Sequence, residues 1–501
     1  MVRFRGHLAA TSAALLLLLP FVLDCGEESL QGDRDIDPSA STRSPISENA
    51  RAAQTSQDSQ DSQDSRAAEL GADRVPREVR QMLREMNEDN VERTIRKLVS
   101  FGTRNTLSVQ DNPTRGVGAA RDWLKSQLDA IAATSGGRMT VELQSYLQPP
   151  APRVPVPTVI TNVVATLRGV QPQSQGRTYV VSGHYDSRAS DVLDATIDAP
   201  GANDDASGVA AVLEMARVMA TRTFDATIVF MAVAGEEQGL LGANHFATTA
   251  KAAGRDIAAM FTNDIVGSSR ADNGARHPRE VRLFAEGVPT AETPAEANTR
   301  RSVGGENDSP ARQLARFIKD ASENSATGMR INVIYRRDRY LRGGDHIPFL
   351  EQGYAAVRFT EPNENYAHQH QTVRVENGVQ FGDLPEFVDF AYTTRVARVN
   401  AAALAALARA PASPKNTRII TAQLTNDTSL AWDANVEPDL AGYEIVFRDT
   451  TEAFWTDSIP VGNVTSFTVK NMSKDNVFFG VRAVDREGHR SPVSFPRPSA
   501  Q

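Results

Sequence analysis

The stretch RTYVVSGHYDS, residues 177–187, indicates how the central part of this chain folds. Its apolar run at Tyr179–Val181 is short and uninterrupted, which is typical of a strand buried on both faces of a sheet. Three more apolar runs of this kind follow, at residues 227–234, 260–262 and 355–359. Segments with helical features lie between them, at residues 208–220, at 240–251 and from the N-cap and proline pair Ser309-Pro310 onward. The alternation predicts an α/β fold, a three-layer sandwich with a mostly parallel central sheet.

Helical segments flank this region on both sides. Apolar residues recur at helical spacing within residues 79–86, 91–99 and 120–128. A long alanine-rich helix is expected from roughly Glu386 to Ala408, and the linker RAPASPK follows at 409–415. Residues 76–410 are therefore predicted to form one domain.

Residues 416–501 have a different character. Short alternating segments such as Tyr443–Phe447 are separated by turns rich in Asp, Gly and Asn, which predicts an all-β sandwich. This stretch resembles a fibronectin type III module, because Trp432 is similar to its inner-sheet tryptophan and FGVRAVDREGHRSP to its later strands. The resemblance implies a spacer, or a module that binds surface or matrix material, without chemistry of its own.

Residues 1–25 have the features of an export signal. Two arginines precede an apolar stretch, residues 8–23, that is too short for a comfortable transmembrane helix. Cys25, at its end, resembles the lipidated cysteine of a bacterial lipoprotein, although Asp24 stands where a small residue is usual. We favour a lipid anchor at this cysteine over a plain secretion signal. Either signal predicts an exported protein at the outer surface or in the periplasm, with no other attachment to a membrane.

Composition narrows the class of protein further. The chain has 501 residues, of which 40% are hydrophobic, enough for two or three domains and at least one large core. Residues 26–75, with the repeat SQDSQDSQDS, lack this apolar content and are predicted to be a disordered polar linker. The only cysteine is Cys25, so any metal site must use His, Asp and Glu. A net charge of −8 without a basic run argues against a nucleic-acid partner.

Acidic and imidazole side chains gather just after the predicted strands. They occur in five segments: GHYDS (183–187), PGANDDASG (200–208), AGEEQGLLG (234–242), TNDIVG (262–267) and ENYAHQHQ (364–371). Open α/β sheets bind ligands at the carboxyl ends of their strands, so we expect these segments to meet at one edge of the sheet. Taken singly, most have a structural explanation, such as a helix N-cap for Asp204-Asp205. Asp264 does not, because a carboxylate in an apolar strand is costly unless it is paired or bound to metal.

Together these side chains predict a site for two metal ions. Zinc takes imidazole nitrogen and carboxylate oxygen, and a catalytic site keeps one position open for water. Two ions roughly 3.5–4 Å apart need one carboxylate that bridges them. One histidine and one terminal carboxylate for each ion, with a shared aspartate, make five protein ligands, and the sequence supplies all of them.

The motifs HxD, NDDASG, GEE, ND and a late histidine occur here in the order and at spacings similar to those of the co-catalytic dizinc exopeptidases. That family includes secreted bacterial leucyl aminopeptidases and glutamate carboxypeptidases, and the resemblance covers roughly residues 80–408. It implies that Asp204 bridges two zinc ions. It also implies that His184 and Asp264 complete one zinc site, and that Glu237 and the late histidine complete the other.

The resemblance assigns further roles near these ligands. Glu236 would be the general base, Asp186 would orient the first imidazole, and a cis peptide bond would join the Asp204-Asp205 pair. For the late histidine we favour His370 over His368. The motifs leave open which residue contacts the substrate or stabilises the oxyanion, and the candidates for these roles are Tyr366, Tyr340 and His346.

The resulting hypothesis is a zinc-dependent aminopeptidase that hydrolyses N-terminal peptide bonds of peptide substrates. A carboxypeptidase of the same family is an alternative, because four arginines that could bind a substrate carboxylate lie close to Asp345, namely Arg336, Arg337, Arg339 and Arg342. Two further candidates are a glutaminyl cyclase, which needs one zinc ion, and a non-catalytic binding protein. The complete set of five ligands argues against both.

Overall fold

The computed structural model describes residues 75–500 of the chain. The predicted export signal, the lipidation site at Cys25 and nearly all of the predicted polar linker lie outside these residues. Among the described helices, none is both long enough and apolar enough to cross a membrane.

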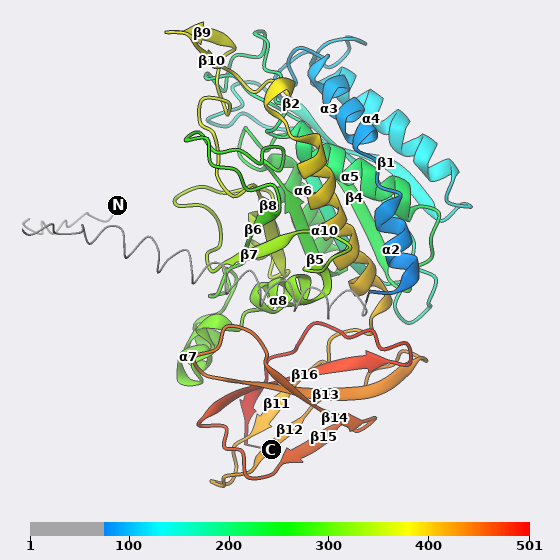
Figure 1. Ribbon diagram of the computed structural model, residues 1–501, viewed down its shortest axis with the longest axis vertical. Helices are drawn as coiled ribbons and strands as arrows, with labels where there is room; N and C mark the ends of the chain where they lie inside the picture. The colour runs from blue at the N-terminus through cyan, green and yellow to red at the C-terminus, as the bar shows by residue number, and fades with distance from the viewer. Residues whose placement is uncertain (1–74, 501) are drawn as a thin grey trace, which may run out of the picture. The chain divides into compact units, whose positions relative to one another are not determined.

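One eight-stranded sheet organises the first part of the described chain (Figure 1). Its strands, in spatial order, are β1 (Met139–Gln148), β2 (Thr158–Leu167), β4 (Thr227–Val233), β3 (Arg177–His184), β5 (Asp256–Asn263), β8 (Ala356–Thr360), β6 (Glu280–Phe284) and β7 (Arg330–Ile334). The central pairs β4–β3, β3–β5 and β5–β8 are parallel. Antiparallel pairing joins β1 to β2, β2 to β4 and β8 to β6. The parallel centre therefore brings the carboxyl ends of β4, β3 and β5 to one edge, where the candidate site lies.

Helices cover both faces of this sheet, as expected for a three-layer α/β sandwich. One face packs against helices α2 (Arg77–Arg84), α3 (Glu88–Val99), α4 (Gly116–Ala133), α5 (Ala206–Met219), α8 (Pro310–Ser322) and α10 (Phe390–Arg409). The other face packs against α6 (Leu241–Ala252) and α9 (Ile347–Glu351). Successive residues of β3 point to opposite faces of the sheet. Tyr179 and Val181 pack in the core on the first face, and Val180 packs in the core on the other face. The predicted fold class is confirmed.

Local sequence signals set the helix starts that matter for the site. Asp205 caps α5 by accepting a hydrogen bond from the backbone N–H of Gly208. Ser309 caps α8 in the same way, with Pro310 as the first helical residue. The long C-terminal helix begins later than expected, at Phe390, because Asp389 is its N-cap and a 3₁₀ turn occupies Pro385–Phe387.

Several shorter elements complete this part of the chain. They are α7 (Pro294–Ser302), a 3₁₀ turn at Gly305–Asn307, and the small hairpin of β9 (Arg374–Glu376) and β10 (Val379–Phe381). Neither this hairpin nor the antiparallel strands β1 and β2 were predicted from the sequence. Strand β1 mixes polar and apolar residues, and most of its residues are partly or fully exposed. It therefore lacks the continuous apolar run that identifies the central strands.

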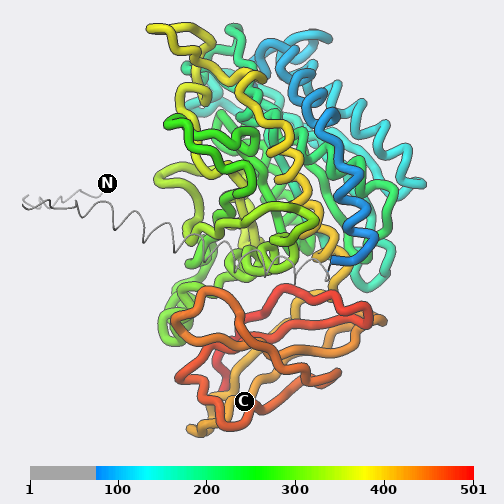
Figure 2. Tube along the Cα trace, in the orientation of Figure 1, coloured from blue at the N-terminus to red at the C-terminus, as the bar shows by residue number. Residues whose placement is uncertain are grey.

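The last part of the chain, coloured orange to red in Figure 2, is all-β, as predicted, and forms two sheets. One sheet contains β15 (Ser466–Val469), β12 (Thr428–Ala431), β11 (Arg418–Ile420) and β17 (Arg497–Ser499). The other contains β14 (Asp457–Gly462), β13 (Leu440–Asp449) and β16 (Val477–Asp485). In the core of this part Trp432 is only 2% exposed and packs against Tyr443. The likeness to a fibronectin type III module stays a prediction.

Candidate metal centre

The parallel centre of the sheet carries the first candidate ligands to one place. His184 is the last residue of β3, and Asp264 directly follows the neighbouring strand β5. Glu237 lies in the turn after β4, the neighbour of β3 on its other side. Asp204 stands just before α5, which packs against β3. Residues far apart in the chain therefore converge because their strands are adjacent and parallel.

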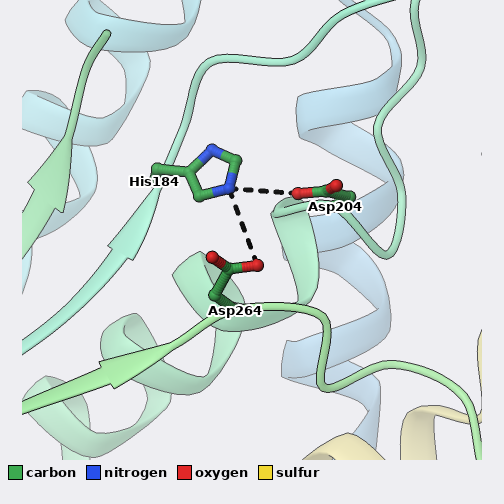
Figure 3. A group of neighbouring side chains, drawn as sticks. All are labelled: His184, Asp204 and Asp264. Carbon is green, nitrogen blue, oxygen red and sulfur yellow. Dashed lines mark ion pairs between the residues drawn. The ribbon is translucent and has the colours of Figure 1, made fainter. Parts of the chain in front are cut away.

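The first group of side chains consists of His184, Asp204 and Asp264 (Figure 3). The Nε2 atom of the imidazole lies 3.0 Å from Oδ1 of Asp204 and 4.0 Å from Oδ1 of Asp264. All three side chains are buried. One nitrogen and two carboxylate oxygens thus face a common point, which is an arrangement that suits a divalent cation.

The second group consists of Asp204, Glu237 and His370. Nε2 of His370 lies 2.8 Å from Oδ2 of Asp204 and 3.1 Å from Oε1 of Glu237. Asp204 belongs to both groups, and each of its carboxylate oxygens faces a different imidazole. A carboxylate in this position is able to bridge two cations.

The donor set fits zinc in composition and in its unsatisfied atoms. Nε2 of His184 and Oε1 of Glu237 are buried, and within the described part of the chain their contacts with Asp204 and His370 do not have the geometry of a hydrogen bond. Burial, reinforced by Asp204, raises the pKa of Glu237. Burial alone would lower the pKa of His370, but the carboxylates of Glu237 and Asp204 raise it to about 11. Cations bound by these groups would compensate the negative charge of the buried carboxylates and would coordinate the atoms that lack a hydrogen bond. The residues therefore fit two zinc ions.

Asp186 supports the site in a different way from the one expected. Its Oδ1 lies 3.5 Å from Nδ1 of His184, whereas its backbone carbonyl oxygen is closer, at 3.2 Å. The carboxylate accepts hydrogen bonds from the hydroxyl of Thr106 at 2.9 Å and from the backbone N–H groups of Glu236 and Glu237 at 3.3 and 3.2 Å. Asp186 therefore fixes the turn that carries the base and a ligand, and its own backbone orients the imidazole.

Asp205 connects three segments of the site. Its carboxylate accepts hydrogen bonds from the backbone N–H groups of His184 at 2.9 Å, Gly208 at 3.0 Å and Ile265 at 3.3 Å. The peptide bond between Asp204 and Asp205 is cis, as the family resemblance implies. The end of β3, the start of α5 and the residue after Asp264 are thus held together by one buried side chain.

Two supporting residues were not predicted from the sequence. Asp383 accepts hydrogen bonds from the backbone N–H groups of Asn203 at 2.8 Å and Asp204 at 2.7 Å. Arg358, which is fully buried, places Nη1 2.7 Å from Oδ2 of Asp264. Asp383 lies outside all of the motifs. Arg358 did carry a signal, since it interrupts the apolar strand at 355–359, where a buried charge requires a partner.

A cavity of about 400 Å³ opens onto both groups. Its lining includes Asp204, Glu237, Asp264 and His370, together with the proposed base Glu236. Burial, with Asp264 and Glu237 nearby, raises the pKa of Glu236 well above its usual value, although His184 opposes the shift. The cavity is also lined by four arginines, Arg153, Arg188, Arg339 and Arg342.

The remaining candidates are not among the residues that line the cavity. Tyr366 and Tyr340 are largely exposed to solvent, at 61% and 75%. His346 is fully buried, and its Nε2 lies 2.8 Å from the backbone oxygen of Arg337. His368 stacks on Phe387, with ring centroids 3.5 Å apart, and takes no part in either group. The structure therefore brings His370 rather than His368 to the acidic groups. The roles of the two tyrosines stay predictions.

Comparisons with known proteins agree with this chemistry. A family model described as Peptidase family M28 matches residues 162–374, which contain all five candidate ligands. Two relatives described as "Probable zinc metalloprotease" share extended identity with the chain. The one from Leptosphaeria maculans is 52% identical over 84% of this chain and 97% of its own length. The one from Pyrenophora tritici-repentis is 49% identical over 91% and 94%. Among solved structures, the LapA aminopeptidase of Legionella pneumophila has a TM-score of 0.46 at 20% identity, covering 66% of this chain and 74% of that one.

Proposed function

Because the chain is a zinc metallopeptidase of family M28, we propose that it is an aminopeptidase that uses two zinc ions to remove N-terminal residues from peptides. The observation that carries the proposal is the position of Asp204 between two imidazoles, with one carboxylate oxygen toward each. A site for a single ion would not need a carboxylate that is shared in this way. The preference for the amino terminus over the carboxyl terminus is supported by the pairing of Arg339 and Arg342 with Glu364, which weakens the basic pocket that a carboxypeptidase needs.

The mechanism follows from the residues around the cavity. Bound zinc ions would supply an acidified water and would polarise the peptide carbonyl. Glu236 accepts the proton of the attacking water and returns it to the leaving amine. The carboxyl group of Glu236 lines the cavity beside the candidate ligands, so it is placed to carry the proton between the two steps. Asp186 fixes the backbone of Glu236 and thereby its distance from the two groups of ligands.

A carboxypeptidase is the second candidate, and the cavity lining supports it in part. Arg339 and Arg342 line the cavity, whereas Arg336 and Arg337 do not. Both lining residues are already paired, because they lie 3.3 and 2.6 Å from the carboxylate of Glu364. A basic pocket built from these four arginines is therefore weaker than their number in the sequence suggests.

Metal analysis with a substrate panel tests the proposal. We expect about two zinc ions per chain, loss of hydrolysis after treatment with a chelator, and recovery when zinc is added. Peptides with a free N-terminus should be cleaved and N-acetylated peptides should not. Cleavage of N-acetylated peptides from their carboxyl end would establish the carboxypeptidase instead. One zinc ion per chain with cyclisation of N-terminal glutamine would establish a glutaminyl cyclase.

The place of action is a separate proposal. The basic, apolar and cysteine-containing sequence of residues 1–25 supports export, with a lipid anchor at Cys25. Fractionation of cells that express the full chain tests both parts. Cys25→Ser should release the protein from the membrane fraction if the cysteine is lipidated, and should leave its distribution unchanged if the segment is a plain secretion signal.

A further inference from the structure

Two of the four arginines that line the cavity have no acidic partner among the described residues. Arg153 donates a hydrogen bond from Nη1 to the backbone oxygen of Glu237 at 2.9 Å. Arg188 donates to the backbone oxygens of Ala189 and Ser190 at 3.1 and 2.9 Å. Within residues 75–500, neither guanidinium group lies in an ion pair with a carboxylate. Their charges therefore face the cavity without a compensating charge from this part of the protein.

Both arginines are attached to segments that carry candidate ligands. The bond from Arg153 to the backbone of Glu237 holds its guanidinium group beside the turn that also contains Glu236. Arg188 follows Asp186 by two residues, and its loop is joined to the segment after His370 by a hydrogen bond of 2.9 Å from the backbone N–H of Thr372 to Ser190 Oγ. The two cationic groups consequently lie at the same cavity as the reacting groups and in fixed positions relative to them.

The balance of charge in the cavity indicates what these groups bind. The ligand carboxylates that line it are the natural partners of the metal ions, so they are not available to neutralise the arginines. Arg153 is exposed and Arg188 is half-buried, so both are able to reach a substrate without a large cost of desolvation. An arginine binds a carboxylate through two parallel hydrogen bonds, which gives strength and orientation together.

We propose that Arg153 and Arg188 select substrates that carry a carboxylate next to the scissile bond. The inference rests on the proposed peptidase function and adds the substrate class to it. The carboxylate has two sources, the side chain of an N-terminal Asp or Glu, or the free terminal carboxylate of a dipeptide. Both present the same planar anion to the guanidinium groups.

Matched substrates separate the two sources. In one arm, peptides that begin with Glu are compared with the same peptides beginning with Gln. In the other, the dipeptide Leu-Gly is compared with its C-terminal amide. We expect the unmodified enzyme to favour the carboxylate by about tenfold in kcat/KM in at least one arm, the size of one charge-assisted hydrogen bond.

Variants then assign the preference to these residues. Arg153→Gln with Arg188→Gln should abolish the preference, mainly by raising KM for the substrate that carries the carboxylate, so that the two members of each substrate pair reach the same kcat/KM within this variant. Arg153→Lys should retain part of it. Arg93→Gln, which removes one positive charge from a residue that does not line the cavity, is the matched control and should retain all of it.

Binding of products gives a readout that does not depend on turnover. By calorimetry, the zinc-loaded enzyme should bind glutamate more tightly than glutamine, and the double variant should bind both equally. The proposal would be overturned if the unmodified enzyme had the same kcat/KM for both substrates of each pair and bound glutamate and glutamine equally. It would also be overturned if the preference for the carboxylate survived in the double variant. Failure to cleave any peptide would instead count against the proposed function, and the calorimetric comparison would still decide the role of the arginines.

Discussion

Asp204 is the residue on which the candidate centre depends. Its two carboxylate oxygens face two different imidazoles, at 3.0 and 2.8 Å. Although burial opposes it, the neighbouring His370 and His184 hold the pKa of Asp204 well below its usual value. Its backbone and side chain are fixed by Asp383 at 2.7 Å and by Gln369 at 3.3 Å. A carboxylate held so closely is suited to bridge two cations with little reorganisation.

Replacement of Glu236 tests the assignment of the base. Glu236→Gln keeps the size and hydrogen-bonding capacity of the side chain but removes its ability to take up a proton. We expect kcat to fall by a factor of about 10²–10⁴ while the zinc content stays the same. Parallel measurements of turnover and bound metal check this. A variant that retains normal turnover would show that another group is the base.

Replacement of Asp383 tests how far the supporting residues matter. In Asp383→Asn one of two backbone N–H groups, from Asn203 or Asp204, loses its carboxylate partner and faces an amide NH₂ instead. We expect zinc affinity to fall by about 10–100-fold, as is typical for partners of metal ligands. Competition titration with a zinc chelator measures the change. Asp129→Asn, on the exposed side of α4, is the control and should bind zinc as tightly as the unmodified enzyme.

The elements of the sheet bring these residues together. The strands β4, β3 and β5 are adjacent and parallel, so the residues at their carboxyl ends become neighbours in space. These strands were predicted from the sequence because each contains a continuous apolar run. The strands β1 and β2 were not predicted, because exposure on one side gives β1 a mixed composition and the polar pair Thr161-Asn162 interrupts the apolar run of β2.

One element of the β-sandwich has a pH-dependent contact that is open to test. Just after β16, Nδ1 of His489 lies 2.8 Å from Oδ2 of Asp485. This hydrogen bond raises the pKa of His489. Burial alone would raise the pKa of Asp485, but the same hydrogen bond to His489 contributes to a net lowering of this pKa. The stability that the histidine contributes is complete below the pKa of histidine in the unfolded chain, and it is lost as the pH rises through the pKa of His489 in the folded protein. The stability that the aspartate contributes is lost as the pH falls below about 4.

We therefore expect His489→Gln to destabilise the protein most at about pH 5–6, by about 1 kcal/mol. The difference should shrink as the pH is raised above the usual pKa of histidine, because the histidine of the unmodified protein then loses its proton. Thermal unfolding of both proteins across this range measures it. A difference in Tm that grows with pH would contradict the assignment.

At the scale of the whole described chain, buried ion pairs join the β-sandwich to the α/β domain. Asp308, just before α8, lies 2.9 Å from Arg316 and 2.7 Å from Arg448 of β13. A second pair, 3.0 Å apart, connects Arg177 to Glu437. These contacts hold the β-sandwich against the α/β domain. Removal of one member of such a pair leaves a buried charge without its partner.

Replacement of Arg448 measures this connection. Arg448→Met retains most of the side-chain volume beside Trp455 but leaves Asp308 with only one of its two cationic partners. We expect a loss of about 3 kcal/mol in stability. By calorimetry the unmodified protein should unfold in one transition, and the variant at a lower temperature. Lys470→Met, which removes an exposed ion pair with Asp427, is the control and should change the Tm little. Independent unfolding of the β-sandwich in the unmodified protein would contradict the coupling.

The sequence by itself determined the fold class and the residue types of the candidate centre. Buried parallel strands leave continuous apolar runs, and a buried carboxylate such as Asp264 is conspicuous among them. The family resemblance already favoured His370 over His368, and the tertiary structure shows why: His370 contacts Asp204, whereas His368 stacks on Phe387. Only the tertiary structure decided the role of Asp383 and the carboxylate with which Arg358 pairs. Contacts of this kind depend on loops and on partners far away in the chain, and no local pattern of residues records them.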